Sequence, residues 1–251
     1  IDSGSTSTDV VILDRERKIV SSVIMPTGAG AANGAERALE EALRQSGLNR
    51  EDIDAVVTTG YGRTAISDGD KSITEITCHA RGAHFLDSSV RTVVDIGGQD
   101  SKVIRLNDDG SVKNFVMNDK CAAGTGRFLE MMAKTMEMSL DELSKVGLSY
   151  QEDITISSMC TVFAESEVVS LIAQNKATDD IVHGLNKAVA AKTASLVKRV
   201  GGEEAYMMTG GVAQNQGLVR TLEERLGTKL VISDKSQLCG ALGAALFAAE
   251  M

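Results

Sequence analysis

The sequence predicts an α/β protein made of two similar lobes around a cleft. Two observations indicate this fold: an internal repeat with a strand, turn, strand pattern, and helices that alternate with single strands after each copy. Helices that cover a sheet bury the apolar face of both elements, which makes this layering stable. With 251 residues, the chain is long enough to give each lobe a core of its own.

The repeat relates residues 1–14, IDSGSTSTDVVILD, to residues 94–107, VDIGGQDSKVIRLN, without gaps and at an offset of 93 residues (Asp2 to Asp95). A polar turn and an apolar run follow each copy, IVSSVIM at 19–25 and VKNFVM at 112–117, so each copy predicts three strands joined by two turns. The glycines lead from strand to strand. A P-loop or a Rossmann fingerprint leads from strand to helix, and both are therefore excluded.

Helices and single strands are predicted after each copy of the repeat. We expect helices over 32–46, 72–86, 124–136, 163–174, 179–200 and 214–226 and from 237 onward, and strands over 55–59, 205–209 and 229–232. The predicted division is an N-terminal lobe over 1–88, a C-terminal lobe over 89–239 and a closing helix over 240–251 that packs back on the N-terminal lobe.

Composition narrows the functional classes. A net charge of −9, three percent aromatic residues and no Trp argue against a nucleic-acid partner, which requires basic surfaces and stacking side chains. No apolar run is long enough for a membrane span and no secretory pattern opens the chain, so we expect a cytoplasmic protein without a membrane partner. Because Ile1 lies within the end of a predicted strand, we expect a short segment to precede it.

The two hairpins, each with an Asp and glycines, resemble the phosphate loops of the actin, hexokinase and heat-shock-70 ATPase superfamily. MTGGVAQN at 208–215, a strand whose two glycines open a helix, resembles the superfamily's adenosine loop. Gly210 and Gly211 would let the backbone approach a flat base closely. Taken alone, this motif is equally well explained as a simple strand-to-helix turn, but three motifs in this order favour ATP binding.

The resemblance implies a set of nucleotide and magnesium contacts. Asp2 and Asp95, each at a strand end, would hold Mg²⁺ through its waters. Asp95, Gln99 and Glu75 are the catalytic candidates, and Gln99, Asp100 and Glu75 remain open alternatives for orienting the attacking water. The predicted nucleotide-binding residues are Gly4, Ser5, Thr6, Gly97, Gly98, Gln99, Asp100, Gly124, Thr125, Gly210, Gly211 and Asn215.

A closer resemblance covers nearly the whole chain. Its motifs are GYGR at 60–63, ITEITCHARGA at 73–83, DIGGQDSK at 95–102, NDKCAAGTGRFLE at 118–130 and SSMCTVFAESEV at 157–168. They resemble the ATP-dependent activators of 2-hydroxyacyl-CoA dehydratases and benzoyl-CoA reductases, the BadF/BadG/BcrA/BcrD type. One departure is Asp9, at a position of the first loop where this family often carries a Lys; Lys102 is present in the second loop.

The family resemblance implies a homodimer that holds one [4Fe–4S] cluster between its subunits. In such a protein, ATP hydrolysis drives a low-potential electron onto a partner dehydratase or reductase, and ferredoxin or flavodoxin is the implied electron donor.

The resemblance assigns Cys121 and Cys160 to this cluster. Each precedes a predicted helix, whose N-terminus would lower the thiol pKa and offset the negative charge of a cluster. Two cysteines per chain would supply four ligands in a two-fold dimer. Cys78 and Cys239 are expected to pack as small hydrophobic residues. A single-chain cluster of all four cysteines is the alternative, and His79, His84 and His183 are expected to be structural.

Two other functions fit the same fold. A small-molecule kinase, for example of a sugar, would explain both hairpins and the adenosine loop, but it would leave the two helix-associated cysteines unexplained. An ATP-responsive regulatory module would bind nucleotide with negligible hydrolysis and without iron. The sequence favours an ATPase coupled to electron transfer because this function uses both the hairpins and the thiols.

Overall fold

The computed structural model confirms the predicted α/β class and describes residues 1–118, 121–157 and 160–251. Residues 119–120 and 158–159, within the two cysteine motifs, lie outside the described residues. The chain forms two units, each assembled from separate stretches of sequence. The first comprises Ile1–Val93, Leu106–Lys113 and Ser233–Met251, and the second comprises Val94–Arg105 and Asn114–Ile232.

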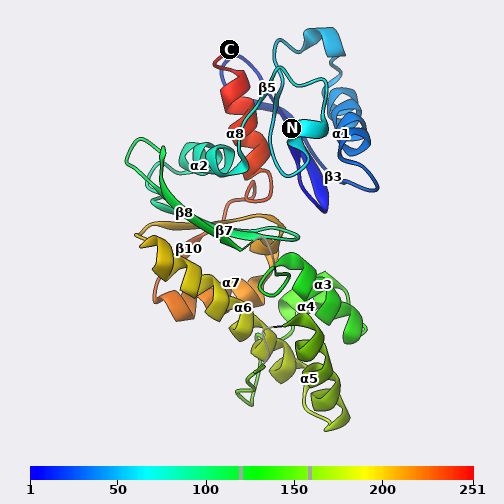
Figure 1. The fold of residues 1–251 in the computed structure, drawn as a ribbon, viewed down its shortest axis with the longest axis vertical. Helices are drawn as coiled ribbons and strands as arrows, with labels where there is room; N and C mark the ends of the chain where they lie inside the picture. The colour runs from blue at the N-terminus through cyan, green and yellow to red at the C-terminus, as the bar shows by residue number, and fades with distance from the viewer. Residues whose placement is uncertain (119–120, 158–159) are drawn as a thin grey trace. The chain divides into compact units, whose positions relative to one another are not determined.

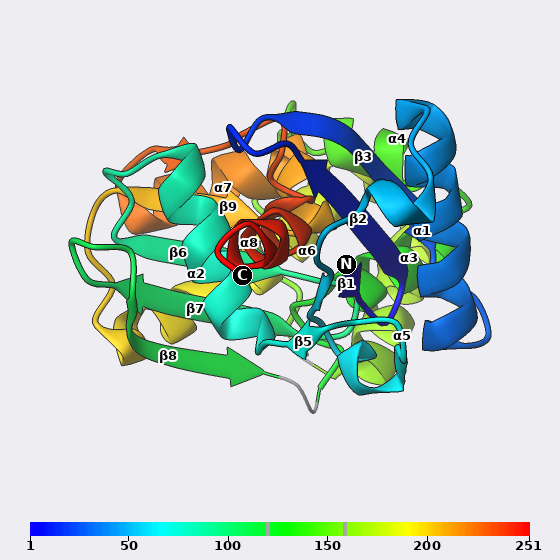
Figure 2. The same cartoon turned by 90° about the horizontal axis from the view of Figure 1, so that it is seen from above.

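The first unit contains the three strands predicted from the first repeat. These are β1 (Asp2–Ser3), β2 (Ser7–Leu13) and β3 (Ile19–Pro26), which pair antiparallel in that order. Successive side chains of a strand point to opposite faces. Accordingly, Val10 and Ile12 join the core formed with α1 (Ala31–Ser46), whereas Val11 joins the core formed with α8 (Cys239–Ala248). Both faces of β2 are therefore covered, and α1 runs alongside β2 and β3 in Figure 2.

The rest of the first unit consists of short elements and one further helix. The short parallel strands β4 (Val57–Thr58) and β5 (Lys71–Ser72) form a pair of their own, and the 3-10 helices η1 (Arg50–Asp52) and η2 (Arg63–Ala65) lie in the connections. Helix α2 (Glu75–Leu86) starts three residues later than expected, because the side chain of Thr74 caps it by accepting a hydrogen bond from Thr77 N–H.

Helices α2 and α8 pack closely against each other (Figure 1). Glycine makes this approach possible on both helices: a Cβ at Gly82 would collide with the carbonyl oxygen of Cys239, and one at Gly243 would collide with that of Cys78. Glycine at positions 82 and 243 is therefore required by the helix crossing.

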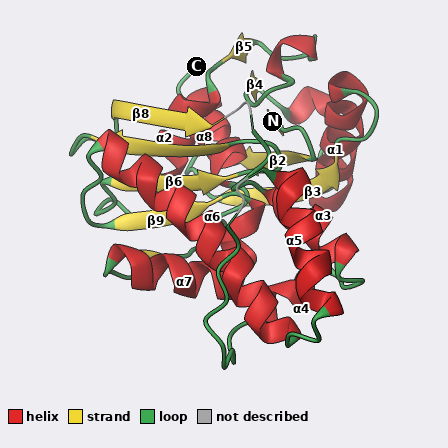
Figure 3. Cartoon of the chain, turned by 60° about the horizontal axis from the view of Figure 1, so that its bottom comes forward, coloured by secondary structure: helices red, strands yellow, loops and turns green. Residues whose placement is uncertain are grey.

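The second unit is built on a five-stranded sheet whose order is β10-β9-β6-β7-β8 (Figure 3). The central strand is buried along its whole length, as expected for a strand with neighbours on both sides. Strands β9 and β10 pair parallel. The strand bounds are β6 (Thr92–Ile96), β7 (Ser101–Leu106), β8 (Val112–Asn118), β9 (Tyr206–Thr209) and β10 (Leu230–Val231).

The helices of the second unit share one core with the sheet. The longest, α6 (Thr178–Val200), packs against α7 (Gln216–Leu226), and both contribute residues to the core that contains Val94, Ile96 and Val103 of the strands. Helix α3 (Gly126–Thr135) packs against α5 (Thr161–Ala173).

Two short elements of this unit were not predicted from the sequence: α4 (Leu140–Lys145) and the 3-10 helix η3 (Gly211–Gln214). The first is short but strongly capped, because Ser139 and Glu142 form a capping box. Throughout the residues described here, no helix combines the length and apolar character needed to cross a membrane.

The close crossing of α2 and α8 can be tested at Gly243. Replacing glycine by alanine inside a helix usually stabilises it by roughly 0.5–1 kcal/mol. We expect Gly243→Ala instead to lower the free energy of unfolding by about 1–3 kcal/mol, because the added Cβ meets the Cys78 backbone. Urea denaturation measures this change. Gly30→Ala is the control, since a Cβ there has no neighbour within 4 Å; a stabilised Gly243→Ala variant would contradict the packing.

Candidate functional site

The two predicted phosphate turns have the same backbone geometry. In the first unit, Gly4 N–H donates to the carbonyl oxygen of Ser7 over 2.9 Å, and in the second unit Gly97 N–H donates to that of Asp100 over 3.0 Å. Gly97 and Asp100 are the residues that the repeat aligns with Gly4 and Ser7. The internal repeat is thus a repeat of local structure as well as of sequence.

The carbonyl groups of both turns are bound within their own unit. Thr27, in the loop after β3, donates its hydroxyl to Gly4 O over 2.9 Å and its N–H to Thr6 O over 3.0 Å. In the second unit, N–H groups at the start of α3 take this role, with Gly126 donating to Gly97 O over 2.8 Å and Arg127 donating to Gly98 O over 2.7 Å. Two carbonyl acceptors of each turn are therefore already used.

The N–H groups at the tips of the turns remain available. Within the described part of the chain, the backbone N–H groups of Ser5, Thr6, Gly98 and Gln99 donate no hydrogen bond. Consecutive unpaired N–H groups in a tight turn form a concave site that favours an anion. Each unit therefore presents one backbone cradle suited to a phosphate group, at the residues that the sequence predicted.

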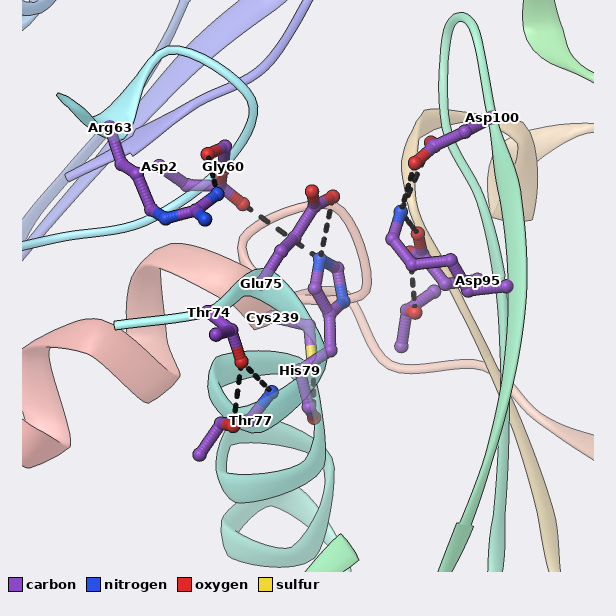
Figure 4. A network of polar contacts seen from close by, with 12 residues as sticks. Asp2, Gly60, Arg63, Thr74, Glu75, Thr77, His79, Asp95, Asp100 and Cys239 are labelled. Atoms are coloured by element: carbon purple, nitrogen blue, oxygen red, sulfur yellow. Dashed lines mark hydrogen bonds and ion pairs between the residues drawn. The ribbon is translucent and has the colours of Figure 1, made fainter. Parts of the chain in front are cut away.

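Asp2 lies in a buried acidic cluster of the first unit (Figure 4). His79 Nε2 is 3.8 Å from Asp2 Oδ2 and 3.8 Å from Glu75 Oε1, so one imidazole lies next to both carboxylates. The side chain of His79 is only 5% exposed. Sequence reasoning treated His79 as structural; the spacing of Glu75 and His79, four residues apart on one helix, was the signal that could have indicated this cluster.

Helix α8 begins next to the Asp2 carboxylate. A Cβ on Gly240 would collide with Asp2 Oδ2, and one on Gly60 would collide with Asp2 Oδ1, so glycine is required on both sides of this carboxylate. Because the N-terminus of a helix carries a partial positive charge, the start of α8 favours the ionised form of Asp2. The cluster therefore keeps a carboxylate directly before the first phosphate turn.

Asp95 of the second unit takes part in a different network. Its Oδ2 accepts a hydrogen bond from Lys102 Nζ over 2.9 Å, and its Oδ1 accepts one from Thr209 Oγ1 over 2.8 Å. Lys102 Nζ also donates to Asp100 Oδ1 over 3.0 Å. The Lys102 side chain is only 1% exposed, and its single charge is shared between the buried Asp95 and the partly exposed Asp100. Figure 4 shows Asp95 and Asp100 in this network.

The predicted adenosine loop follows Thr209 directly. Gly210 has a φ of +83°, and a Cβ there would collide with the carbonyl oxygen of Ile96, so only glycine fits this position. Gly211 starts η3, and the side chain of Asn215 then caps α7 by accepting a hydrogen bond from Leu218 N–H over 2.9 Å. Helix α7 therefore begins at Gln216, two residues later than expected.

Other predicted site residues lie beside the second turn. Gln99 is exposed at its tip. Gly124 has a φ of +82° and its carbonyl accepts a hydrogen bond from Ser101 Oγ over 3.2 Å. Thr125 is buried, and its hydroxyl donates to Ala122 O over 2.7 Å. Gly124 and Thr125 thus shape the turn that leads into α3, while a direct nucleotide contact from either remains a prediction.

The four cysteines fall into two classes. Cys121 and Cys160 are exposed, whereas Cys78 and Cys239 are buried. Cys160 is the N-cap residue of α5, and Cys121 lies four residues before Thr125, the N-cap of α3. Burial raises the pKa of the Cys78 thiol to about 11, which keeps it protonated at neutral pH. The structure thus separates the thiols as the sequence led us to expect, and their binding to a cluster stays a prediction.

Comparison with known proteins identifies relatives along the whole chain. Residues 1–248 match the BadF/BadG/BcrA/BcrD ATPase family. The 2-hydroxyisocaproyl-CoA dehydratase activator of Clostridioides difficile is 49% identical over 99% of this chain and 93% of its own length. The activator of lactoyl-CoA dehydratase of Anaerotignum propionicum is 48% identical over 100% of this chain and 96% of its own. The (R)-2-hydroxyglutaryl-CoA dehydratase activating ATPase of Acidaminococcus fermentans is 44% identical over 99% of this chain and 95% of its own length.

Solved structures agree with this relationship. The activator of the 2-hydroxyisocaproyl-CoA dehydratase from Clostridium difficile with bound ADPNP has a TM-score of 0.95 at 48% identity, covering 99% of this chain and 92% of that one. Component A of the Acidaminococcus fermentans (R)-2-hydroxyglutaryl-CoA dehydratase has a TM-score of 0.96 at 44% identity, covering 100% of this chain and 96% of that one. A glucokinase of the ROK family from Streptomyces griseus shares the fold, with a TM-score of 0.60. It is 14% identical over 100% of this chain and 98% of that one.

The network around Lys102 predicts a large effect of its removal. We expect Lys102→Met to lower the free energy of unfolding by about 3–5 kcal/mol, because it leaves the buried Asp95 without its cation. Chemical denaturation of the two proteins measures the difference. Lys198→Met removes the same charge from an exposed position of α6 and is expected to change stability by less than about 0.5 kcal/mol. Equal effects of the two substitutions would contradict the network.

The exposure of the cysteines predicts which thiols react. In cluster-free protein, we expect iodoacetamide at pH 8 to label Cys121 and Cys160 quickly and to leave Cys78 and Cys239 unlabelled until the chain unfolds. Mass spectrometry of the digested protein measures each site. Rapid labelling of Cys78 in the folded protein would contradict both its burial and its raised thiol pKa.

Proposed function

The chain belongs to the BadF/BadG/BcrA/BcrD ATPase family, and from this we propose that it hydrolyses ATP to drive one-electron transfer onto a partner enzyme. The observation that carries the proposal is the pair of matching turns, whose tips present unused N–H groups. Backbone N–H groups of this kind bind the phosphate of a nucleotide, and they do not depend on a second substrate such as the sugar of a kinase. The exposed cysteines before α3 and α5 are the proposed cluster ligands for the electron-transfer part of the function.

In the proposed ATPase, both turns bind the phosphate groups of Mg-ATP. Asp2 and Asp95 supply carboxylates for the magnesium ion, which retains several of its waters. Glu75, Gln99 and Asp100 are the candidates for orienting the attacking water. His79, which lies next to the Asp2 and Glu75 carboxylates, would keep Glu75 close to Asp2. Catalysis would rest on positioning and on charge neutralisation, because phosphoryl transfer needs little covalent chemistry from the protein.

Cys121 and Cys160 fit the ligand set of an iron–sulfur cluster. Both thiols are exposed, and Cys160 is the N-cap of α5. A [4Fe–4S] cluster needs four ligands, so we propose that two copies of the chain contribute two cysteines each. When bound, such a cluster supplies a low-potential electron. The buried thiols of Cys78 and Cys239 do not suit this role, which disfavours a single-chain cluster of all four cysteines.

The proposed partner is a 2-hydroxyacyl-CoA dehydratase. The relatives described above are activators of dehydratases that act on three different 2-hydroxyacyl-CoA thioesters. The shared element in these names is the thioester of a 2-hydroxy acid, while the acyl group varies. We therefore propose this substrate class for the partner enzyme, and ferredoxin or flavodoxin as the electron donor to the cluster.

The proposal is tested by the iron and sulfide content of protein purified without oxygen, together with EPR of the dithionite-reduced sample. We expect four irons per dimer and a signal that changes when Mg-ATP is added. A stable, ATP-binding monomer without iron would contradict the proposal. If such a monomer phosphorylated a small molecule steadily, the kinase alternative would replace it.

Substitution of one cysteine separates the redox half from the nucleotide half. We expect Cys121→Ala to lose the cluster iron while the chain stays folded and binds ATP, since Cys121 is exposed and distinct from both turns. Cys78→Ala is the control and is expected to retain iron. Iron analysis and calorimetric titration with Mg-AMPPNP measure the two properties. An unchanged iron content in Cys121→Ala would overturn the assignment of this ligand.

A further inference from the structure

The GYGR segment at 60–63 forms a turn that is fixed to the end of strand β1 in the first unit. Gly62 N–H donates to the carbonyl oxygen of Ser3 over 2.9 Å. Gly60 has a φ of +87°, and a Cβ on it would collide with Asp2 Oδ1 and with Ser3 O. The turn is therefore in direct contact with the two residues that precede the first phosphate turn.

Arg63 lies at the end of this segment and its side chain is turned back toward it. Its Nη1 donates to Gly60 O over 3.0 Å, which orients the guanidinium in the neighbourhood of Asp2 (Figure 4). Among the residues that the structure describes, no carboxylate lies within ion-pair distance of this guanidinium. A guanidinium has five N–H donors, so most of those on Arg63 remain available for another group.

Two other described cations near the phosphate turns are engaged differently. Lys102 is buried between Asp95 and Asp100. Arg37 directs one nitrogen, Nη2, to the carbonyl oxygens of Pro26 and Thr27, on the segment that supports the first turn. Arg63 differs from both, because it is half-buried, has a single hydrogen bond from its side chain and lies next to the Asp2 cluster.

The negative charge near the first turn would be stabilised by a nearby cation. Asp2, Asp9 and Glu75 place three carboxylates on or near the hairpin, and a nucleotide adds the negative charge of its phosphates. Backbone N–H groups contribute only partial charges. A full positive charge at the edge of this cluster would offset the repulsion between carboxylate and phosphate.

We propose that Arg63 binds the terminal phosphates of the nucleotide and is the cation of the first phosphate site. The inference rests on the ATP-dependent function proposed above and assigns a new residue to it. A guanidinium matches the paired oxygens of a phosphate with two parallel N–H donors, which an ammonium group does not. The hydrogen bond to Gly60 O holds the side chain in place before the ligand arrives, which lowers the ordering cost of binding.

The test compares Arg63→Ala and Arg63→Lys with Arg50→Ala in the dimeric, cluster-containing protein. Arg50 is a matched control: it lies in the same unit, is exposed, and its guanidinium donates to one backbone carbonyl, that of Asp68, over 3.4 Å. Calorimetric titration with Mg-AMPPNP and Mg-ADP at low and high salt gives the dissociation constants. Steady-state hydrolysis gives kcat and KM for Mg-ATP, and thermal denaturation confirms that each variant is folded.

We expect Arg63→Ala to weaken Mg-AMPPNP binding by about 10- to 100-fold, the loss typical of a hydrogen bond to a charged group. The salt dependence of binding should also fall, because an ionic contact is removed. Arg63→Lys should recover part of the affinity, and Arg50→Ala should match the unchanged protein. A purely structural role for Arg63 would lower the melting temperature and leave the salt dependence as it was.

Two outcomes would overturn the inference. One is an Arg63→Ala protein that is folded and has the same dissociation constants and KM as Arg50→Ala. The other is a loss of affinity that is identical at both salt concentrations and is not relieved at all by lysine. Failure of the proposed function looks different, because the unsubstituted protein would then either lack iron or neither bind nor hydrolyse ATP. The two hypotheses are therefore tested separately by the same set of titrations.

Discussion

The binding of the turn carbonyls within each unit is the interaction on which both candidate phosphate sites depend. A tight turn exposes donors and acceptors together, and an anion is repelled by the acceptors. Here Thr27 takes up the carbonyls of Gly4 and Thr6, and the first N–H groups of α3 take up those of Gly97 and Gly98. The N–H groups at the tips, in contrast, donate no hydrogen bond among the described residues. The two units reach this state by different means, one with a loop side chain and one with a helix N-terminus.

Carboxylates stand directly before both turns, and their burial has to be compensated. In the second unit, Lys102 and Thr209 satisfy Asp95 by ordinary hydrogen bonds. In the first unit, the start of α8 lies against Asp2, and His79 lies beside it. This contact is possible because glycine occupies positions 60 and 240. The same helix has glycine at position 243 where it crosses α2, so a single packing requirement brings α8 against α2 and against the carboxylate.

The elements that follow from local pattern were predictable from the sequence. The repeat predicted both sets of three strands. The glycines of the adenosine loop were predicted to approach a base, which stays a prediction, whereas the structure shows Gly210 against the carbonyl oxygen of Ile96. The short elements were missed because their signals are short: α4 has six residues, and η3 delays the start of α7 by two residues. The sequence predicted a closing helix over 240–251 that packs back on the N-terminal lobe, and α8 packs against α2 of the first unit. It did not predict that Leu106–Lys113 belongs to the first unit.

The sequence identified candidate site residues within single motifs. It did not show which residues from separate segments meet at the candidate site. The repeat aligned Asp2 with Asp95 and Gly4 with Gly97, and the resemblance to known ATPases implied their roles, which stay predictions. His79 and Arg63 belong to segments far from the first hairpin in the sequence, and only the folded unit brings them to it. The pairing of Lys102 with two carboxylates could likewise not be predicted, because the sequence shows a lysine in the loop but not which groups surround it.

Within the second unit, the phosphate turn and the cysteine segments are connected by a short series of contacts. The N–H groups of Gly126 and Arg127 bind the turn carbonyls, and Cys121 lies only a few residues earlier in the same segment. Helix α3 continues from there to α5, where Thr135 donates to Glu165 over 3.1 Å, and α5 begins at Cys160. A change of position at Gly97 or Gly98 therefore acts directly on the start of α3. In the ATPase proposed above, these contacts connect the second phosphate turn to the segments of both exposed cysteines within a single unit.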